Sequence, residues 1–180
     1  AEYTAGVLSF NTKNVSLVSF APGEQPFYFP TTAAQQDYNP YYEVGSLEYP
    51  TPLAANIPAS QLIGSMGVGW LPYLDLPANM WASVTTPAIA ECRKAMAEAQ
   101  QDFTKGTTLG IAAWICDDWM LLRKVFEPGT TPATEAGIRQ AADALGASFK
   151  PASTFRSQFA TTRTHDGVAG YRLIAFQEGC

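Results

Sequence analysis

One stretch near the N-terminus constrains the fold most, because a strand, a helix and a second strand follow one another closely there. Residues 15–20 are a short apolar run with β-branched side chains, and a Pro-Gly turn follows directly. Residues 26–38 contain good helix formers once the chain has passed Pro30, and an Asn-Pro pair then ends the segment. Residues 41–46 return to β-prone side chains. A helix between two strands so close in sequence predicts a parallel pair with a right-handed crossover.

The predicted parallel pair also predicts where a ligand would bind. In such sheets, ligands bind in the crevice beyond the carboxyl ends of the strands. For these two strands, the ends are residues 21–25 and 46–49. We therefore expect a ligand site to include side chains from both loops.

Three further segments belong to the same N-terminal part. Residues 2–13 place three apolar side chains where they can line one helical face. Residues 51–62 contain two prolines and several alanines, which favours a loop with short helical turns. Residues 63–70 are apolar with three glycines, which suit close backbone approach in a strand better than they suit a helix. The sequence thus predicts a third strand there.

The remaining chain is predicted to be helical up to one last strand. Residues 71–86 contain two prolines and no clean period, and we interpret them as a connection between two lobes. Helices are predicted from Pro87, over residues 107–126 and from Thr131 to a C-cap at Gly146, and a final strand over residues 171–176. The middle helix is apolar almost all round, so we expect it between other elements. The first of these helices is expected to bury a stripe formed by Ile89, Cys92, Met96, Ala99 and Phe103.

The composition is typical of a globular protein and argues against two classes, a membrane-spanning protein and a nucleic-acid-binding protein. With 180 residues, the chain is long enough to bury a core, and 47% of its residues are hydrophobic while 15% are charged. No apolar run reaches the roughly 20 residues that a membrane helix needs. The net charge of −5 and the pI near 4.8 disfavour nucleic acid as a partner, because phosphates require clustered Lys and Arg.

The chain has three cysteines, so at most one internal disulfide can form. Cys92 and Cys116 lie on the apolar stripes of two consecutive predicted helices, and antiparallel packing would bring them together. In the chain-entropy model, a bridge between them would stabilise the fold by roughly 3 kcal/mol or slightly more. The alternative is that both are buried thiols, as in a reduced cytoplasmic protein. Cys180, the last residue, leads us to expect a segment of a longer protein.

The sequence argues against catalysis and against a bound metal or cofactor. His165 is the only histidine and could act as a base to Cys92 or Cys116, but the motifs of known thiol enzymes are absent, and a turn residue is the simpler interpretation. One histidine without C-x-x-C spacing does not make a zinc site. Asp117 and Asp118 are neighbours on a predicted helix, so they point about 100° apart and cannot form a facing acid and base pair. We expect no catalytic residue, no metal ligand and no cofactor.

Five segments, taken in their order along the chain, carry a resemblance to a known family. They are residues 15–20, 33–40, 64–70, 116–122 and 171–176. The chain resembles the C-terminal half of the type I periplasmic binding proteins, which are the leucine/isoleucine/valine-binding-like receptors of ABC importers. The resemblance spans essentially all 180 residues.

The resemblance implies an α/β fold with a Rossmann-like parallel sheet flanked by helices, in a partial chain that lacks its N-terminal portion. Residues 1–70 would belong to the second lobe, residues 71–150 would be a helical portion that returns to the first lobe, and residues 151–180 would cross back and add the final strand of the second lobe. Such a receptor closes on a small solute without chemistry. Its partners would be that solute, an ABC permease and the missing N-terminal half, and it would be extracytoplasmic, as a periplasmic protein or a cell-surface lipoprotein.

The resemblance also places ligand contacts. The loop formed by Gly23, Glu24 and Gln25 falls where the family has a ligand-contacting side chain. Ser46 falls where the family often has the acidic residue that holds the ligand's ammonium group, and Glu48 is a candidate substitute for it.

The remaining candidate contacts are aromatic or align with an aromatic position of the family. Cys116 aligns with an aromatic position that can face the cleft, a role that a bridge to Cys92 would exclude. Tyr49 and Trp70, near strand ends, suit an apolar or ring-bearing solute such as an amino acid or a related compound, although Trp70 suits core and hinge packing equally well.

The first hypothesis is therefore a solute-binding receptor. The second is the effector-sensing domain of a cytoplasmic regulator with the same fold, which reduced cysteines would favour. The third is an enzyme that uses Cys116 and His165.

Overall fold

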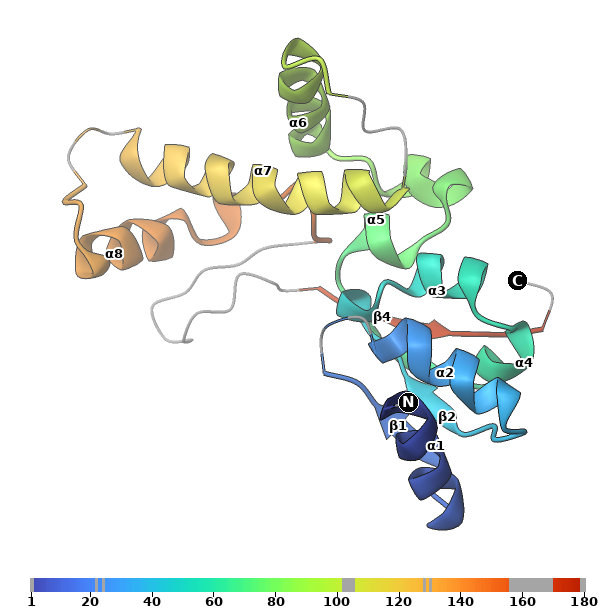
Figure 1. Ribbon diagram of the computed structural model, residues 1–180. Coiled ribbons are helices and arrows are strands. Elements are labelled where there is room, and N and C mark those ends of the chain that lie inside the picture. Colours follow the sequence, from blue (N-terminus) through green and yellow to red (C-terminus); the bar gives the residue numbers. More distant parts are fainter. Residues whose placement is uncertain are drawn as a thin grey trace. The chain divides into compact units, whose positions relative to one another are not determined.

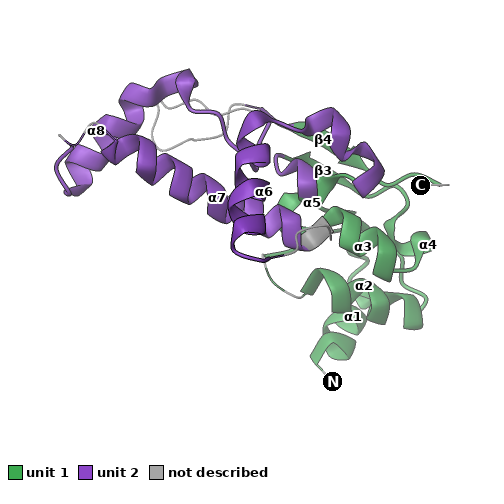
Figure 2. Ribbon diagram, turned by 90° about the horizontal axis from the view of Figure 1, so that it is seen from above, with its two compact units in different colours: residues 1–69, 74–76, 172–180 green, residues 70–73, 77–171 purple. Residues whose placement is uncertain are grey.

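The computed structural model describes residues 2–21, 23, 25–101, 106–127, 129, 131–155 and 170–178. The chain forms two compact units (Figure 2). Unit 1 contains residues 1–69, 74–76 and 172–180, and unit 2 contains residues 70–73 and 77–171. Among the described residues, no helix is long and apolar enough to cross a membrane.

Unit 1 contains the sheet and the first helices (Figure 1). Its elements in chain order are α1 (Glu2–Thr12), β1 (Leu17–Ser19), α2 (Gln25–Gln35), β2 (Tyr41–Glu43), the 3₁₀ turn η1 (Ser46–Glu48), α3 (Pro50–Asn56), α4 (Ala59–Leu62), β3 (Met66–Gly69) and β4 (Arg172–Ala175). The short α5 (Pro72–Asp75) spans the boundary between the two units.

The sheet has the strand order β1-β2-β3-β4. β1 and β2 are parallel, with Leu17 opposite Tyr41, and β2 and β3 are also parallel. β4 returns antiparallel to β3, with Ile174 opposite Gly67. The predicted parallel pair and the predicted α/β class are therefore confirmed.

Helices α1 to α4 contribute to one core on a single face of the sheet. Val18 and Tyr42, which are buried on β1 and β2, pack in a cluster with side chains from all four helices. The helical members of this cluster are Val7, Phe29, Ala33, Leu53 and Leu62. On the opposite face, alternate strand residues are exposed, with exposed fractions of 59% at Leu17, 64% at Met66 and 80% at Leu173. In the described part of the chain, the helices thus cover one face of the sheet.

A buried polar network fixes the start of β2. The Tyr42 hydroxyl donates to Gln61 Oε1 over 2.9 Å, and Gln61 Nε2 donates to the Tyr38 carbonyl over 3.0 Å. The backbone N–H of Tyr42 donates to Ser65 Oγ over 2.9 Å. Burial raises the pKa of the Tyr42 phenol, and the nearby Tyr38 acts in the same direction. Because each of these buried groups finds a partner, the network stabilises one register of the strands.

The described secondary structure of unit 2 consists of helices and 3₁₀ turns. It contains the 3₁₀ helix η2 (Ala78–Val84), α6 (Pro87–Glu98), α7 (Gly106–Phe126), α8 (Glu135–Leu145) and the 3₁₀ turn η3 (Gly146–Ser148). Cys92 on α6 and Cys116 on α7 form a disulfide, with a Cα–Cα distance of 5.9 Å. The predicted bridge is therefore present.

Several predicted bounds are corrected. α2 begins at Gln25 and contains Pro30 in its interior, whereas the sequence placed the helix formers after that proline. α8 begins at Glu135, because the Thr134 hydroxyl, rather than Thr131, caps it by accepting from the Gly137 N–H. The prediction that Gly146 ends this helix is confirmed.

The predicted surroundings of α6 and α7 are also corrected. On α6, Ile89 and Cys92 are buried and Met96 is half-buried, but Ala99 follows the helix end and is exposed. Phe103, the last member of the predicted stripe, lies outside the described residues. α7 buries one face, while its other face exposes the apolar side chains of Ile111, Trp114, Ile115, Trp119 and Leu122.

Candidate functional site

The carboxyl edge of the sheet in unit 1 is the site that the sequence predicts. β1 ends at Ser19 and β2 ends at Glu43, and the two strands are parallel neighbours. The loops that follow them therefore leave the sheet at the same edge. The first loop leads into α2, and the second leads into η1 and α3.

In the first loop, the side chain of Gln25 lies close to the backbone of Gly23. Gly23 has φ +149°, and a Cβ added there would lie 2.8 Å from Gln25 Oε1. The Gln25 side chain therefore lies against the backbone of Gly23, at the first residue of α2, and Gln25 is exposed to solvent. Glu24, which the sequence also proposes as a ligand contact, lies outside the described residues. An exposed amide at a sheet edge can donate and accept a hydrogen bond to a polar ligand group.

The second loop is a tight turn held by its own side chains. Ser46 and Glu48 are buried, and Glu48 Oε2 accepts a hydrogen bond from the Gly45 N–H over 2.8 Å. Tyr49 has a left-handed backbone with φ 55° and separates η1 from α3. Because one Glu48 oxygen already caps the turn, this carboxylate is less suited to hold a ligand's ammonium group than the sequence suggested.

The last two predicted contacts, Trp70 and Cys116, belong to unit 2. Trp70 is half-buried. The Cys116 sulfur is bonded to Cys92, so neither cysteine is a free thiol that could act as a nucleophile or as a polar ligand contact. His165, the proposed base, and Cys180 lie outside the described residues.

Sequence reasoning missed Asp75, which lies at the carboxyl end of β3. Its side chain packs against the last residue of the strand, because a Cβ added at Gly69 would lie 2.8 Å from Asp75 Cγ. Asp75 is 7% exposed. Burial lowers the pKa of Arg172 on β4, and the Asp75 carboxylate acts against this lowering. The signal in the sequence was an acidic residue, Asp75, six positions after Gly69 at the strand end. It was missed because residues 71–86 were interpreted only as a connection between lobes.

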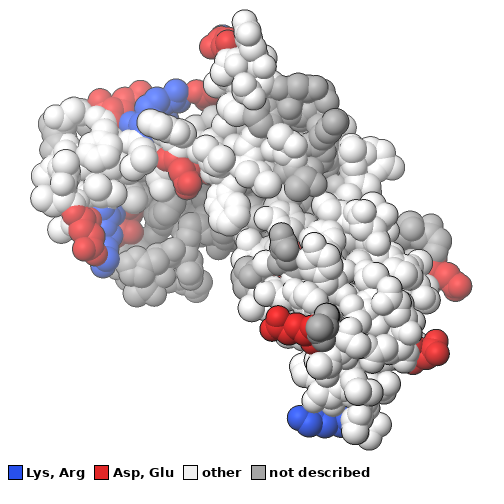
Figure 3. Space-filling model, viewed as in Figure 1, with Lys and Arg blue, Asp and Glu red and all other residues white. Residues whose placement is uncertain are grey.

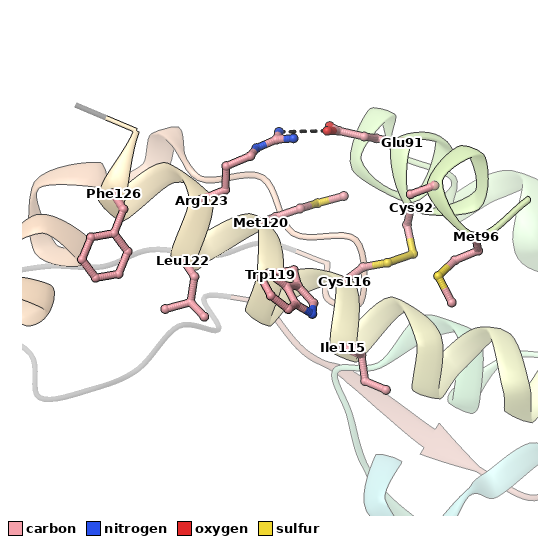
Figure 4. Close-up of a pocket in the computed structure, with 11 residues that line it drawn as sticks. Glu91, Cys92, Met96, Ile115, Cys116, Trp119, Met120, Leu122, Arg123 and Phe126 are labelled. Atoms are coloured by element: carbon pink, nitrogen blue, oxygen red, sulfur yellow. Dashed lines mark ion pairs between the residues drawn. A yellow bond between two sulfur atoms is a disulfide. The ribbon is translucent and has the colours of Figure 1, made fainter. Parts of the chain in front are cut away.

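Unit 2 contains an open apolar pocket that the sequence did not predict. It has a volume of about 860 Å³ and lies around the disulfide, where α6 and α7 meet (Figure 4). Met96, Ile115, Trp119, Met120, Leu122 and Phe126 line it together with both cysteines. The Arg123 guanidinium and the Glu91 carboxylate form an ion pair of 2.8 Å among the lining residues. The apolar members of this lining can bury an apolar surface.

A half-buried carboxylate holds another part of unit 2 together. Asp117 on α7 accepts hydrogen bonds from the N–H groups of Ala152 and Ser153 and from the Ser153 hydroxyl. Burial raises the pKa of Asp117, although these hydrogen bonds act in the opposite direction. These hydrogen bonds tie α7 to the segment at residues 152 and 153. Among the described residues, no group of three His, Cys, Asp or Glu side chains could hold a metal ion.

Charged groups of the described residues do not form a continuous surface on the face shown in Figure 3. Figure 3 shows small acidic and basic groups separated by wide uncharged areas on the face that it presents. Arg123, Lys124 and Arg139 each form an ion pair with a carboxylate. This face therefore lacks the basic stripe that a nucleic-acid backbone would require.

The chain matches no known protein-family model and no curated protein.

Proposed function

We propose that the chain is part of an extracytoplasmic solute-binding receptor of an ABC importer. In this proposal, the carboxyl edge of the sheet in unit 1 forms one wall of a solute site, and the protein performs no chemistry. The parallel register of β1 and β2 carries the proposal, because it brings the loops after both strands to the same edge. An antiparallel pairing would have separated residues 23–25 from residues 46–49.

The side chains at this edge support a small, largely uncharged solute. Gln25 offers an exposed amide, and the half-buried Tyr49 offers an aromatic ring. Glu48 is occupied as a cap, so we expect hydrogen bonds from Gln25 and from backbone groups, rather than a carboxylate, to fix the solute. An amino acid or a related apolar or ring-bearing compound fits this description, and Asp75 is a further candidate contact at the end of β3.

Uncovered apolar surfaces support the proposed partner, which is an N-terminal half of the same receptor. Parallel sheets are normally covered on both faces. In unit 1, Leu17, Met66 and Leu173 are exposed on the face that the helices leave open. In unit 2, α7 exposes Trp119 and its apolar neighbours. We propose that further polypeptide of the receptor covers both surfaces, because exposed apolar patches of this kind are rare in complete monomeric proteins.

The disulfide supports the proposed location. Bridges such as Cys92–Cys116 persist mainly in oxidising compartments. A cytoplasmic regulator with the same fold would instead keep its three cysteines as thiols. The mass of freshly isolated protein after alkylation, with and without prior reduction, distinguishes the two functions. One alkylated cysteine before reduction and three after it supports the receptor, whereas three before reduction supports the regulator.

The test of the proposed function is solute binding to the complete polypeptide that contains this chain. A panel of free amino acids and small aromatic acids is screened by thermal shift. A solute present at about 100 times its Kd stabilises the native state by roughly 2.7 kcal/mol, so a shift of several degrees is expected.

Two variants then locate the solute. Gln25→Ala is expected to weaken binding by about tenfold or more, because a hydrogen bond to the solute is lost. Gln140→Ala removes a matched exposed amide on α8 in unit 2 and should leave affinity unchanged. Equal affinity in the wild type, Gln25→Ala and Tyr49→Ala would show that this edge is not the solute site.

A further inference from the structure

The two halves of α6 are held in different ways. Its buried residues are Ala88, Ile89 and Cys92, which all lie in the first half of the helix. Before the helix, the Thr86 hydroxyl accepts from the Ile89 N–H over 3.2 Å and donates to the Pro151 carbonyl over 3.4 Å. The first half is therefore anchored by packing and by hydrogen bonds.

The second half has much weaker support. Of residues 93–98, Met96 is half-buried and the others are exposed. The nearby ion pair between Glu91 and Arg123 joins side chains that are 51% and 57% exposed, and ion pairs of this kind contribute little. The strongest tie close to this half is the bond from Cys92 to Cys116 on α7, with Met96 beside it (Figure 4).

We infer that the Cys92–Cys116 disulfide is a redox-dependent clamp that keeps the second half of α6 on α7. A dithiol reductant supplies the two electrons. One of its thiolates attacks a sulfur of the bridge to form a mixed disulfide, and its second thiol then displaces the protein sulfur. The bridge takes up two electrons and two protons and becomes two cysteine thiols, while the reductant becomes a disulfide. The inference is independent of the proposed solute site.

Opening the clamp has a local consequence. Residues 93–98 bury little of their own surface, so they open more readily once the bond at Cys92 no longer fixes the preceding turn of α6 on α7. Met96 then leaves the wall of the apolar pocket, which opens towards solvent. The first half of α6 and the rest of unit 2 keep their own contacts and remain folded. The structure of α6 thus depends on whether the compartment oxidises its cysteines.

Two native trypsin sites test this clamp. Arg93 and Lys94 follow Cys92 directly and are exposed on α6. Proteolysis of a locally opened segment follows the population of the open form. In a Cys92→Ser/Cys116→Ser variant, which avoids adding reductant to trypsin, cleavage after these residues should be at least about tenfold faster than in the oxidised wild type. Cleavage after Arg139 on α8 is the internal reference and should change less than about twofold.

A matched variant separates the disulfide from the ion pair. Glu91→Gln removes the ion pair with Arg123 but leaves the bridge intact, so cleavage after Arg93 should stay within about twofold of the wild type. Hydrogen exchange of residues 93–98 in dithiol-reduced wild type gives a second readout that needs no substitution. An unchanged rate after Arg93 would overturn the clamp. Equal acceleration after Arg93 and Arg139 would also overturn it, because the whole of unit 2 would then have unfolded.

Discussion

Gly67 on β3 is the position where adding one methyl group should most damage the parallel sheet. A Cβ added there would overlap the Val44 carbonyl oxygen and would lie 2.5 Å from the Val44 carbonyl carbon. These are backbone atoms of the neighbouring segment, so no side chain can rotate away to make room. Gly67→Ala must therefore push β3 away from the residues that follow β2.

The cost of this displacement has two parts. Overpacking of a well-packed interior costs about 1–3 kcal/mol. The adjacent hydrogen bond from the Val44 N–H to the Met66 carbonyl, 3.1 Å long, would be stretched, and Val44 is fully buried. Leaving a buried backbone group without its partner costs a further 1–3 kcal/mol or so. We expect Gly67→Ala to lower the free energy of unfolding of unit 1 by about 4 kcal/mol.

A matched substitution in the same unit should have the opposite sign. A Cβ added at Gly6, inside α1, would meet nothing within 4 Å. Gly6→Ala should therefore stabilise unit 1 by about 0.5–1 kcal/mol, because alanine loses less entropy in a helix. Both variants change one glycine to alanine, so their difference isolates the contact with Val44.

Urea denaturation followed by far-ultraviolet circular dichroism measures these changes. Tryptophan fluorescence provides an internal control, because all four tryptophans belong to unit 2. They are Trp70, Trp81, Trp114 and Trp119. The fluorescence transition should therefore be the same in both glycine variants and in the wild type. A loss below about 1 kcal/mol in Gly67→Ala would refute the close approach of β3 to Val44.

Three further predictions concern covalent, titrating and hydrogen-bonded groups. Replacing Cys92 and Cys116 by alanine opens a loop of about 25 residues and should lower the free energy of unfolding of unit 2 by about 3.5 kcal/mol. Urea denaturation followed by tryptophan fluorescence measures this loss, and a loss near zero would contradict the entropic role of the bridge. Burial raises the pKa of Tyr42, so above about pH 10 the native state keeps a proton that the unfolded chain loses. The free energy of unfolding should therefore fall as the pH rises above about 10, and the fall should be smaller in Tyr42→Phe. Asp117→Ala removes the acceptor of the Ser153 N–H and should cost about 1–3 kcal/mol, with faster exchange of that amide; unchanged exchange would argue against the bond.

The parallel pairing of β1 and β2 could be predicted because each determinant is local. Short β-branched runs, a turn signal and an intervening helix suffice to predict a parallel pair with a crossover, whereas the register, with Leu17 opposite Tyr41, was not predicted. The start of α2 could not be predicted, because Pro30 argues against a helix interior. In the structure, Pro30 is buried beside Phe29, so tertiary packing outweighs the backbone penalty.

The details of the candidate site were less predictable, because they depend on side chains folding back on their own loops. Residues 44–46 were predicted to continue a strand, but the Glu48 carboxylate caps Gly45 and a left-handed Tyr49 follows. The apolar character of α7 predicted burial on all sides, whereas Trp119 is 72% exposed. A hydrophobic pattern indicates that a surface needs covering, but it does not say which chain covers it.

The two edge strands of the sheet, β1 and β4, differ in how they could pair with an additional strand. β1 forms one border and contributes three residues, so its outer side offers few backbone groups for an incoming strand. A strand added beside β1 in the same direction would lengthen the edge at which the carboxyl ends of the parallel strands lie, which is the edge proposed to bind a solute. At the other border, β4 runs in the reverse direction and interrupts that row. An enlargement of the proposed binding edge within this sheet would therefore have to occur at β1, where the pairing strand could be only short.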